Sequence, residues 1–229
     1  MACRGVARPG GDGQSRAVTQ SRRLIDISAR PSATRPLDRA ELPVDTDQLA
    51  RFLIGKMVVR TLAEGVVAGR IVETEAYVIG DPAGHAWRGM TPRNRTLFLQ
   101  RGHAYVYLAY GISFMLNVSS ETPGVGAGVL IRALEPTVGI PIMQRNRGIE
   151  QVRDLARGPG RLCVALGIDR GLDGMDLCQA GPLWLGTDGQ AADEFGQSKR
   201  IGITRAADSL LRFYVRGNRF VSGPRALNS

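Results

Sequence analysis

The stretch from Arg70 to Tyr77, which reads R-I-V-E-T-E-A-Y, constrains the fold and the chemistry of this chain more than any other. A β-strand points alternate side chains to opposite faces, so Glu73, Glu75 and Tyr77 are expected on one face, with small and apolar residues on the other. Two glutamates on one face repel each other, and glutamate is a poor strand former. A catalytic carboxylate beside an aromatic wall would explain the arrangement. Taken alone, however, the stretch favours an exposed strand face that carries solvated acids.

The residues before this stretch predict a helix followed by a hairpin. Asp45 is suited to cap the N-terminus of a helix with one apolar face, and Gly55 is suited to end it. Residues 57–62 and 66–77 then read as two strands joined by a short turn. The acidic stretch therefore lies in the second strand of a hairpin.

A second hairpin is expected over residues 104–119, where three of the five tyrosines of the chain lie. Tyr105 and Tyr107 share one face of its first strand, while Tyr110 falls with Gly111 at the turn. A bulky aromatic side chain at the tip of a hairpin in a basic protein suggests a wedge that enters between stacked bases. A tyrosine folded back over the hairpin would explain the pattern equally well.

Arg132 and His85 are two further residues of interest. Arg132 lies in the apolar run 129–134, and because an unpaired buried charge is very costly, it needs an acidic partner or an anion. Glu75 or Glu73 is the obvious partner. His85 ends the loop that follows the acidic strand, where a lone histidine is usually solvated or hydrogen-bonded locally.

The remaining chain predicts helices and the completion of the sheet. A helix is expected over residues 138–146, and a second helix opens near Pro159 and runs to about Leu166. Strands are expected near residues 182–185, 200–204 and 211–217.

Length and composition fit one globular domain. The chain has 229 residues, of which 43% are hydrophobic, enough for a full core. No apolar run reaches membrane-spanning length and no secretory leader is visible, so we expect a soluble, intracellular protein with no membrane partner. The three cysteines lack CxxC spacing and only two histidines are present, so we expect no metal and no disulfide framework.

The charge of the chain indicates its partner. A net charge of +9 and a pI near 10.3 predict attraction to a polyanion, with nucleic acid first and an anionic membrane second. Residues 1–43 mix Gly, Pro, Ser and Arg without periodicity and are expected to form a disordered basic arm. The folded domain is then expected over residues 44–223, followed by a short tail over residues 224–229.

Several motifs of the chain occur in one order that is typical of a known family. The motifs are Arg70–Tyr77, Thr91–Arg95, Tyr105–Tyr107 with Tyr110–Gly111, Asn117–Ser120, Ile131–Pro136, Gly158–Pro159 and Arg212–Gly217. Together they closely resemble the alkyladenine DNA glycosylase family, over about Leu49 to Ser222. The resemblance implies a single compact α+β domain with a curved, mostly antiparallel sheet, flanked by helices and bearing a hairpin that inserts into the DNA minor groove.

The resemblance also implies an activity. Members of this family flip a damaged purine out of duplex DNA and hydrolyse its N-glycosidic bond, leaving an abasic site. Glu75 would then be the general base on the attacking water, and Arg132 would hold it ionised. Tyr77, His85 and Tyr107 would form the aromatic pocket around the base.

Other residues receive roles by the same resemblance. Asn117 would oppose the exocyclic amino group of normal guanine, while Tyr110 and Ile112 would intercalate into the DNA. The tip departs from the family pattern at Ser113, where a second bulky residue is common, which removes contact area. We also expect DNA-backbone contacts from the basic residues Arg93, Arg95 and Arg161.

The expected enzyme is a monofunctional glycosylase of base excision repair. A lyase activity usually needs an amine nucleophile, but Lys56 and Lys199 are the only lysines and both lie outside the motifs. Alkylated or deaminated purines, namely 3-methyladenine, 7-methylguanine, hypoxanthine and ethenoadenine, all remain possible substrates. We expect no cofactor and a monomer acting on double-stranded DNA, in the bacterial cytoplasm at the nucleoid or in a eukaryotic nucleus.

Two other functions stay open at this stage. The family's fold resembles a domain that binds tRNA in formyltransferases, so the chain could be a nucleic-acid-binding module without chemistry. It could also be an enzyme of free nucleosides with the same pocket. Glu75 argues against the first, because a pure binder has no use for a carboxylate that faces a polyanion. The tip tyrosine and the net charge argue against the second.

Overall fold

The sheet of this protein is built around β3 (Gly65–Tyr77), the strand that carries the acidic stretch. One edge of β3 pairs with β6 (Gly128–Val138) over most of its length. The other edge pairs first with β2 (Met57–Leu62) and then with β9 (Arg212–Val215). All these pairings are antiparallel, and the predicted hairpin of β2 and β3 is confirmed.

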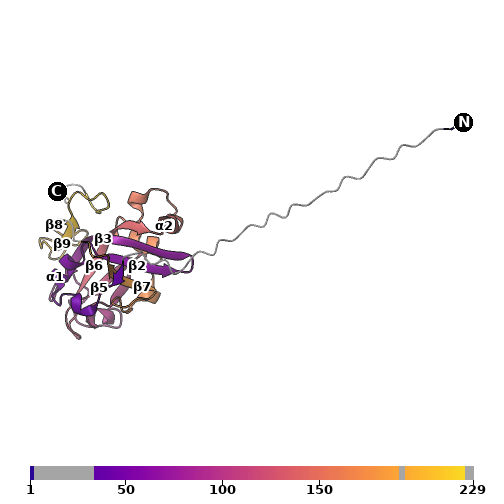
Figure 1. The fold of residues 1–229 in the computed structure, drawn as a ribbon. Helices are drawn as coiled ribbons and strands as arrows, with labels where there is room; N and C mark the ends of the chain where they lie inside the picture. Colours follow the sequence, from indigo (N-terminus) through magenta and orange to yellow (C-terminus); the bar gives the residue numbers. More distant parts are fainter. Residues whose placement is uncertain (3–33, 191–193, 225–229) are drawn as a thin grey trace.

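The structure is a computed structural model that describes residues 1–2, 34–190 and 194–224 (Figure 1). Within these residues the strands form one sheet in the order β1-β7-β2-β3-β6-β5-β4, and β9 joins β3 to β8. The remaining strands are β1 (Arg35–Pro36), β4 (Ala104–Ala109), β5 (Ser113–Ser119), β7 (Leu183–Thr187) and β8 (Phe195–Ser198). The curled antiparallel sheet and its helices make one compact α+β domain, as predicted.

A bulge in β3 bends the sheet at the acidic stretch. The register with β6 shifts on both sides of Glu73, between Ile71 and Glu73 and again between Glu73 and Thr74. A bulge adds local twist and breaks the simple alternation of side chains. As a result Ile71 and Val72 are both in the hydrophobic core, although strict alternation would place them on opposite faces.

Three α-helices are present in the described residues: α1 (Thr46–Leu53), α2 (Ile140–Arg147) and α3 (Pro159–Leu166). Asp45 caps α1 by accepting a hydrogen bond from the amide of Gln48, as its position predicts. The first helix packs on β3, while α3 packs on β5 and β6 and contacts α2. Short 3₁₀ helices lie at Arg39–Glu41 (η1), Arg95–Phe98 (η2), Val152–Asp154 (η3) and Arg170–Leu172 (η4). None of the described helices has the length and apolar character needed to cross a membrane.

The folded domain begins ten residues earlier than the sequence predicts. Residues 34–43, which we assigned to the disordered arm, form β1 and η1. Leu37 and Leu42 are buried, and the Leu37 amide donates to the carbonyl of Leu185. This order comes from pairing with distant β7, which a local pattern does not reveal. The rest of the predicted arm, residues 3–33, and most of the predicted tail lie outside the described residues.

The prediction of a strand near residues 200–204 is wrong. This segment has no regular structure, and the strand of this region is β8, which ends at Ser198. The amide of Ile201 donates to the Glu75 carboxylate, and the guanidinium of Arg200 donates to the carbonyl of Ala76. The polar groups of this segment therefore form hydrogen bonds to the acidic strand β3 instead of pairing as a strand of the sheet.

Candidate active site

Glu73 and Glu75 are both fully buried, with exposed fractions of 0%. The expectation of an exposed face with solvated acids is therefore wrong. The segments that contain Ile201 and Ser222 lie against the two glutamates, and each donates a backbone amide to one of them. Burial of an ionised carboxylate is very costly unless it is paired and hydrogen-bonded, so the surroundings of each glutamate define what it can do.

Both carboxylate oxygens of Glu73 accept hydrogen bonds from buried donors. Its Oε1 accepts from Nε of Arg212 at 2.7 Å, from Nε of Arg132 at 3.0 Å and from the hydroxyl of Ser222 at 2.9 Å. Its Oε2 accepts from the Ser222 amide at 2.7 Å. Burial works to raise the pKa of Glu73, but Arg132 and Arg212 together outweigh it and hold the pKa below its usual value of 4.5. The lowered pKa favours the ionised form of Glu73, which binds both arginines.

Glu75 has fewer partners. Its Oε1 accepts from the Ile201 amide at 2.7 Å and from Nη1 of Arg132 at 3.1 Å, and its Oε2 accepts from the Tyr77 hydroxyl at 3.0 Å. Burial raises the pKa of Glu75, and its single guanidinium with these hydrogen bonds opposes the shift only in part. A carboxylate whose pKa moves toward neutrality is better suited to accept a proton.

Arg132 joins the two carboxylates, so the predicted acidic partner is confirmed, and the structure shows that Glu73 and Glu75 both fill this role. It uses Nε for Glu73 and Nη1 for Glu75, and its side chain is only 9% exposed. Arg212 and Ser222 complete the network, but sequence reasoning missed them. Arg212 is the first residue of a short apolar strand, just as Arg132 lies within an apolar strand. Because an unpaired buried charge is costly, the same reasoning would have predicted an acidic partner for Arg212.

A cavity of about 370 Å³ lies directly above this network. The predicted pocket residues Tyr77, His85, Tyr107 and Asn117 all line it, together with Arg132. Glu75 lies just behind the wall, since Tyr77, Arg132 and Ile201 both line the cavity and contact its carboxylate. Pockets of this size, mostly aromatic and apolar with a few polar groups, are typical of small-molecule or base-binding sites.

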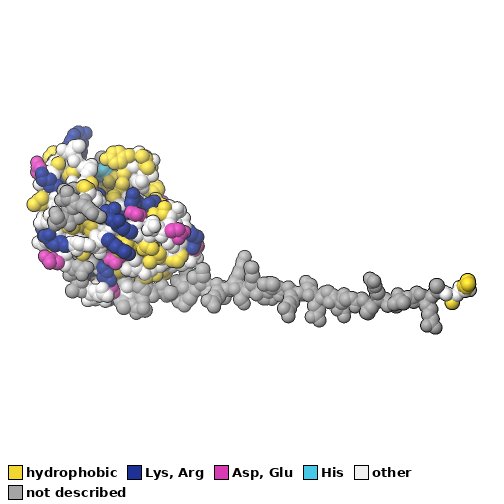
Figure 2. All heavy atoms as spheres, turned by 90° about the horizontal axis from the view of Figure 1, so that it is seen from above, with side chains coloured by type: hydrophobic (Ala, Val, Ile, Leu, Met, Phe, Trp, Pro, Cys, Tyr) yellow, Lys and Arg dark blue, Asp and Glu magenta, His cyan; other side chains and the backbone are white. Residues whose placement is uncertain are grey.

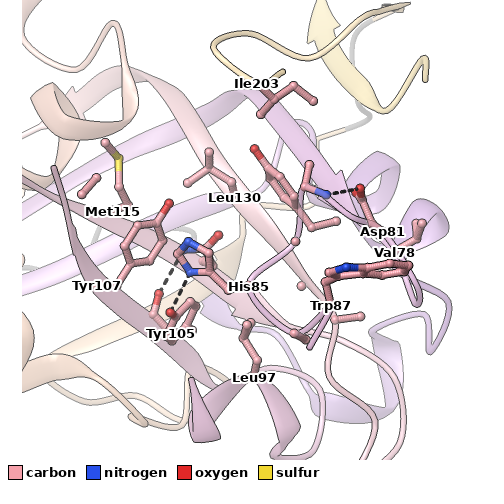
Figure 3. Close-up of a pocket in the computed structure, with 18 of the residues that line it drawn as sticks. Val78, Asp81, His85, Trp87, Leu97, Tyr105, Tyr107, Met115, Leu130 and Ile203 are labelled. Atoms are coloured by element: carbon pink, nitrogen blue, oxygen red, sulfur yellow. Dashed lines mark hydrogen bonds between the residues drawn. The ribbon is translucent and has the colours of Figure 1, made fainter. Parts of the chain in front are cut away.

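Three aromatic rings are packed together on one side of the cavity (Figure 3). The His85 ring lies edge-on to Tyr107, with 4.4 Å between ring centroids, and its Nδ1 is 2.9 Å from the Tyr105 hydroxyl. Tyr105 and Tyr107 stack with centroids 5.3 Å apart. Burial and nearby Arg93 lower the pKa of His85, so its ring is neutral near pH 7. Tyr105, which sequence reasoning placed on the same face but gave no role, fixes the histidine.

The opposite side of the cavity is formed by loops that follow β3 and β8. In Figure 3, Asp81 and Trp87 lie across from Tyr107, and Ile203 lies above the cavity. Arg200 is buried behind this wall, where it pairs with Asp81 and its guanidinium lies 4.7 Å from the centroid of the Tyr77 ring. Asn117 is held on β5 by a 3.2 Å hydrogen bond from its Nδ2 to the carbonyl of Tyr105.

The tip of the hairpin of β4 and β5 is exposed. Tyr110 and Ile112 have exposed fractions of 90% and 83%, so the alternative of a tyrosine folded back over the hairpin is wrong. Tyr110 and Gly111 both have positive φ, 51° and 70°, and the Ile112 amide donates to the Ala109 carbonyl. These are features of a type I′ turn, whose conformation is costly for a tyrosine. Tyr110 also reaches the rim of the cavity.

The three arginines predicted to contact a DNA backbone are all on the surface. Arg93 and Arg95 lie in the turn before and at the start of η2, and Arg161 lies on α3, where it forms a partly exposed ion pair with Asp154 at 3.4 Å. Figure 2 shows Lys and Arg side chains interspersed with hydrophobic and acidic ones across one face. Among the described residues, no group of three His, Cys, Asp or Glu side chains is placed to hold a metal ion.

The arrangement of these residues defines a class of protein. A buried, hydrogen-bonded carboxylate behind an aromatic cavity, in a basic protein with an exposed aromatic tip, is typical of an enzyme that acts on a base displaced from a nucleic acid. The family model for methylpurine-DNA glycosylase (MPG) matches residues 40–219, which is more than half of the chain.

Relatives of known name support the same assignment. A protein of Mesorhizobium japonicum is 73% identical over 192 residues, covering 84% of this chain and 92% of that protein. A protein of Paraburkholderia phytofirmans is 51% identical over 192 residues, covering 84% and 90%. A protein of Methanoculleus marisnigri is 47% identical over 182 residues, covering 78% and 94%. Each is named "Putative 3-methyladenine DNA glycosylase".

The chain belongs to the methylpurine-DNA glycosylase family. It is accordingly a DNA-repair enzyme of the N-glycosylase class, a hydrolase whose substrate is DNA.

Proposed function

We propose that this protein is a monofunctional glycosylase that flips alkylated or deaminated purines out of duplex DNA and hydrolyses their N-glycosidic bonds with an activated water. The observation that carries this proposal is the position of Glu75, a carboxylate of raised pKa directly behind the wall of an aromatic cavity. The proposed substrates are 3-methyladenine, 7-methylguanine, hypoxanthine and ethenoadenine, and the product is an abasic site.

Glu75 acts as the general base in this proposal. Its Oε1 already accepts from Arg132 and Ile201, so a water must bind at Oε2, where it shares or replaces the hydrogen bond from the Tyr77 hydroxyl. As the purine departs, the sugar develops positive charge, and the ionised carboxylate both stabilises this charge and takes the proton from the water. Arg132 keeps the carboxylate in position and favours its ionised form.

The flipped base is held between aromatic rings. Tyr77, His85 and Tyr107 all line the cavity, so a planar purine can stack on their rings. Electron-poor alkylated purines gain most from such stacking, and it accepts many base shapes. Asn117 narrows this tolerance by opposing the exocyclic amino group of guanine.

The exposed tip fills the space that the flipped nucleotide leaves. Tyr110 and Ile112 project apolar surface from the end of the hairpin next to the cavity, as side chains that wedge between base pairs do. The exposed arginines Arg93, Arg95 and Arg161 contact DNA phosphates. The protein works as a monomer at chromosomal DNA, in the nucleoid or nucleus.

Water is the nucleophile, because neither lysine reaches the cavity. Lys56 lies 4.8 Å from the centroid of the Phe52 ring, and Lys199 pairs with Asp208 at 2.6 Å. Neither residue lines the cavity. A Schiff-base lyase needs an amine at the reacting carbon, so no strand cleavage accompanies base removal.

The test is single-turnover excision by the wild-type protein from duplexes that carry one hypoxanthine or one ethenoadenine, and from methylated duplex DNA. We expect strand breaks only after alkali treatment, which cleaves abasic sites. Breaks before alkali treatment would contradict the monofunctional mechanism. A folded protein that binds these duplexes but excises none of the bases would instead be a binding module.

A further inference from the structure

Arg200 is buried beside the candidate active site, and the mechanism described above gives it no role. Its side chain has an exposed fraction of 0%, and it forms a bidentate ion pair with Asp81, whose side chain is 2% exposed. Its Nε is buried without a hydrogen-bond partner in the described part of the chain. A buried ion pair seldom adds net stability, because taking both charges out of water is costly. Stability alone therefore does not explain why an arginine occupies this position.

The guanidinium group of Arg200 holds three segments together. Its Nη1 donates to the carbonyl of Ala76, near the end of β3, at 2.9 Å. Nη1 and Nη2 both donate to the carboxylate of Asp81, in the loop after β3. Nη2 also donates to the carbonyl of Ala206 at 3.4 Å. Arg200 thus fixes its own segment, the end of β3 and the loop after it relative to one another.

Two of the groups that donate to Glu75 lie next to Arg200. Ile201, whose amide donates to Oε1 of Glu75 at 2.7 Å, is the next residue in the chain. Tyr77, whose hydroxyl donates to Oε2 of Glu75 at 3.0 Å, has its ring centroid 4.7 Å from Cζ of Arg200. A guanidinium group over an aromatic ring attracts it and restrains its position. Because Arg200 forms its ion pair with Asp81, its link to Glu75 runs through these two donors.

We propose that Arg200 is a positioning residue for the general base: it keeps the Ile201 amide and the Tyr77 hydroxyl directed at the Glu75 carboxylate, and so favours the ionised form that accepts a proton from water. This inference rests on the proposed function, which assigns Glu75 as the base. Burial raises the pKa of Glu75, while Arg132 and the two hydrogen bonds oppose the shift. When Arg200 no longer holds the two donors, the pKa of Glu75 should rise further.

Several other charged or titratable groups lie around Glu75, and a substitution of Arg200 replaces none of them. Among the described residues they are Arg132 on β6, Glu73 and Tyr77 on β3, Tyr107 on β4 and Arg212 on β9. The segment of Arg200 itself adds Lys199, whose ammonium group pairs with Asp208 at 2.6 Å. A change in the titration of Glu75 therefore reports either the charge of Arg200 or the geometry that it imposes on the two donors.

The first variant, Arg200→Lys, separates these two effects. It keeps the positive charge beside Asp81 but loses the planar fork, so one ammonium group must replace contacts to a carboxylate and two carbonyls. We expect the midpoint of the acidic limb of single-turnover excision, from a duplex with one hypoxanthine, to rise by about one pH unit. This shift is a tenfold change in the ionisation constant, as for loss of one hydrogen bond to a charged group. The rate on the plateau above the limb should change less.

The matched control is Arg70→Lys. Arg70 also binds a carboxylate, that of Asp188, and a carbonyl, that of Gly55, and its side chain is only 17% exposed. It lies five residues before Glu75 on β3, and its partners do not line the cavity. The control should keep the wild-type midpoint. An Arg200→Lys protein that keeps the wild-type midpoint, or whose rate falls equally at every pH, would overturn the proposal.

A second variant applies if Arg200→Lys does not fold. Arg200→Gln combined with Asp81→Asn replaces the ion pair with two neutral amides, so no buried charge is left unpaired, and the same rise is expected. The pKa of Glu75 is also measured without activity, by a carbon-13 NMR titration of the glutamate carboxyl groups in which Glu75→Gln assigns the signal. An unchanged pKa of Glu75 in the folded variants contradicts only this inference. A wild-type protein that excises no base contradicts only the proposed function.

Discussion

Glu73 and Glu75 are two residues apart on β3 and equally inaccessible to solvent, yet their surroundings differ. Glu73 accepts from two guanidinium groups and twice from Ser222, while Glu75 accepts from one guanidinium group, one amide and one phenol. The pKa of Glu73 is held below its usual value, and burial raises the pKa of Glu75. Two neighbouring acids pushed in opposite directions indicate separate tasks.

The difference shows how the partners of a buried carboxylate determine whether it can accept a proton. Glu73 forms an ion pair with Arg212 and also accepts from Nε of Arg132. Arg132 contacts Glu75 through Nη1. Glu75 is therefore partly compensated and lies next to the cavity. In this account Glu73 is a positioning residue that acts through Arg132, and Glu75 is the group that meets the attacking water.

Replacing Glu73 with Gln should have the largest effect on stability. The change leaves two buried arginines without their shared carboxylate, and removal of one partner from a buried ion pair costs about 3–5 kcal/mol. Urea unfolding measures this loss. Glu41→Gln is the matched control, because its partner Arg35 is exposed and surface pairs contribute little. A Glu73→Gln protein as stable as the control would contradict the structural role of Glu73.

The pH dependence of stability should distinguish the two glutamates by sign. Because the folded pKa of Glu73 is lowered, its contribution is present above about pH 4.5 and is lost as the pH falls through the folded pKa. The folded pKa of Glu75 is raised, so stability from its protonated form is lost as the pH rises from 4.5 through that pKa. Unfolding free energies across this range, for wild type and for each Gln variant, should diverge in these opposite directions. Parallel curves would refute the distinction.

Replacing Tyr77 with Phe should have a smaller effect. The change removes the hydroxyl that donates to Oε2 of Glu75 at 3.0 Å, at a cost of about 1 kcal/mol in stability. That hydrogen bond favours the ionised form, so its loss should raise the pKa of Glu75 further. The acidic limb of the excision rate should then shift to higher pH, while stacking on the ring persists. A shift to lower pH would show that the hydroxyl does not act on Glu75.

A substitution of Tyr110 at the exposed tip should have the smallest effect on stability. Tyr110→Gly removes the wedge and relieves the positive φ at this position, so stability should change by about 1 kcal/mol or less. Single-turnover excision from duplex DNA should slow. Excision from single-stranded DNA serves as the control, because it needs no wedge. Equal slowing on both substrates would argue against a role of Tyr110 in base flipping.

The sequence predicts the elements that depend on local patterns. The hairpins of β2–β3 and β4–β5, and helix α1 with its Asp45 cap, all follow from side-chain alternation, turn residues or capping. The missed β1 and the wrong strand near 200–204 depend instead on distant partners, Leu185 and Glu75. Local patterns carry no information on such contacts.

The same division applies to the site. The pairing of Arg132 with the acidic strand is predictable, because a charge in an apolar run needs a partner. The burial of both Glu73 and Glu75 could not be predicted from the sequence. It depends on the bulge at Glu73 and on the loops at Ile201 and Ser222, which come together only in the folded chain. The pattern of the strand alone favoured solvent exposure.

The most direct test of this account is the pH dependence of single-turnover excision by the wild type and by Glu75→Gln. We expect the wild-type rate to rise with pH through a pKa above the usual carboxyl value of 4.5. The Gln variant should be slower by a factor of about 10²–10⁴ and show no such rise, while it still binds DNA and remains folded. A folded Glu75→Gln protein that keeps the wild-type rate and its acidic limb would contradict the assignment of Glu75 as the general base.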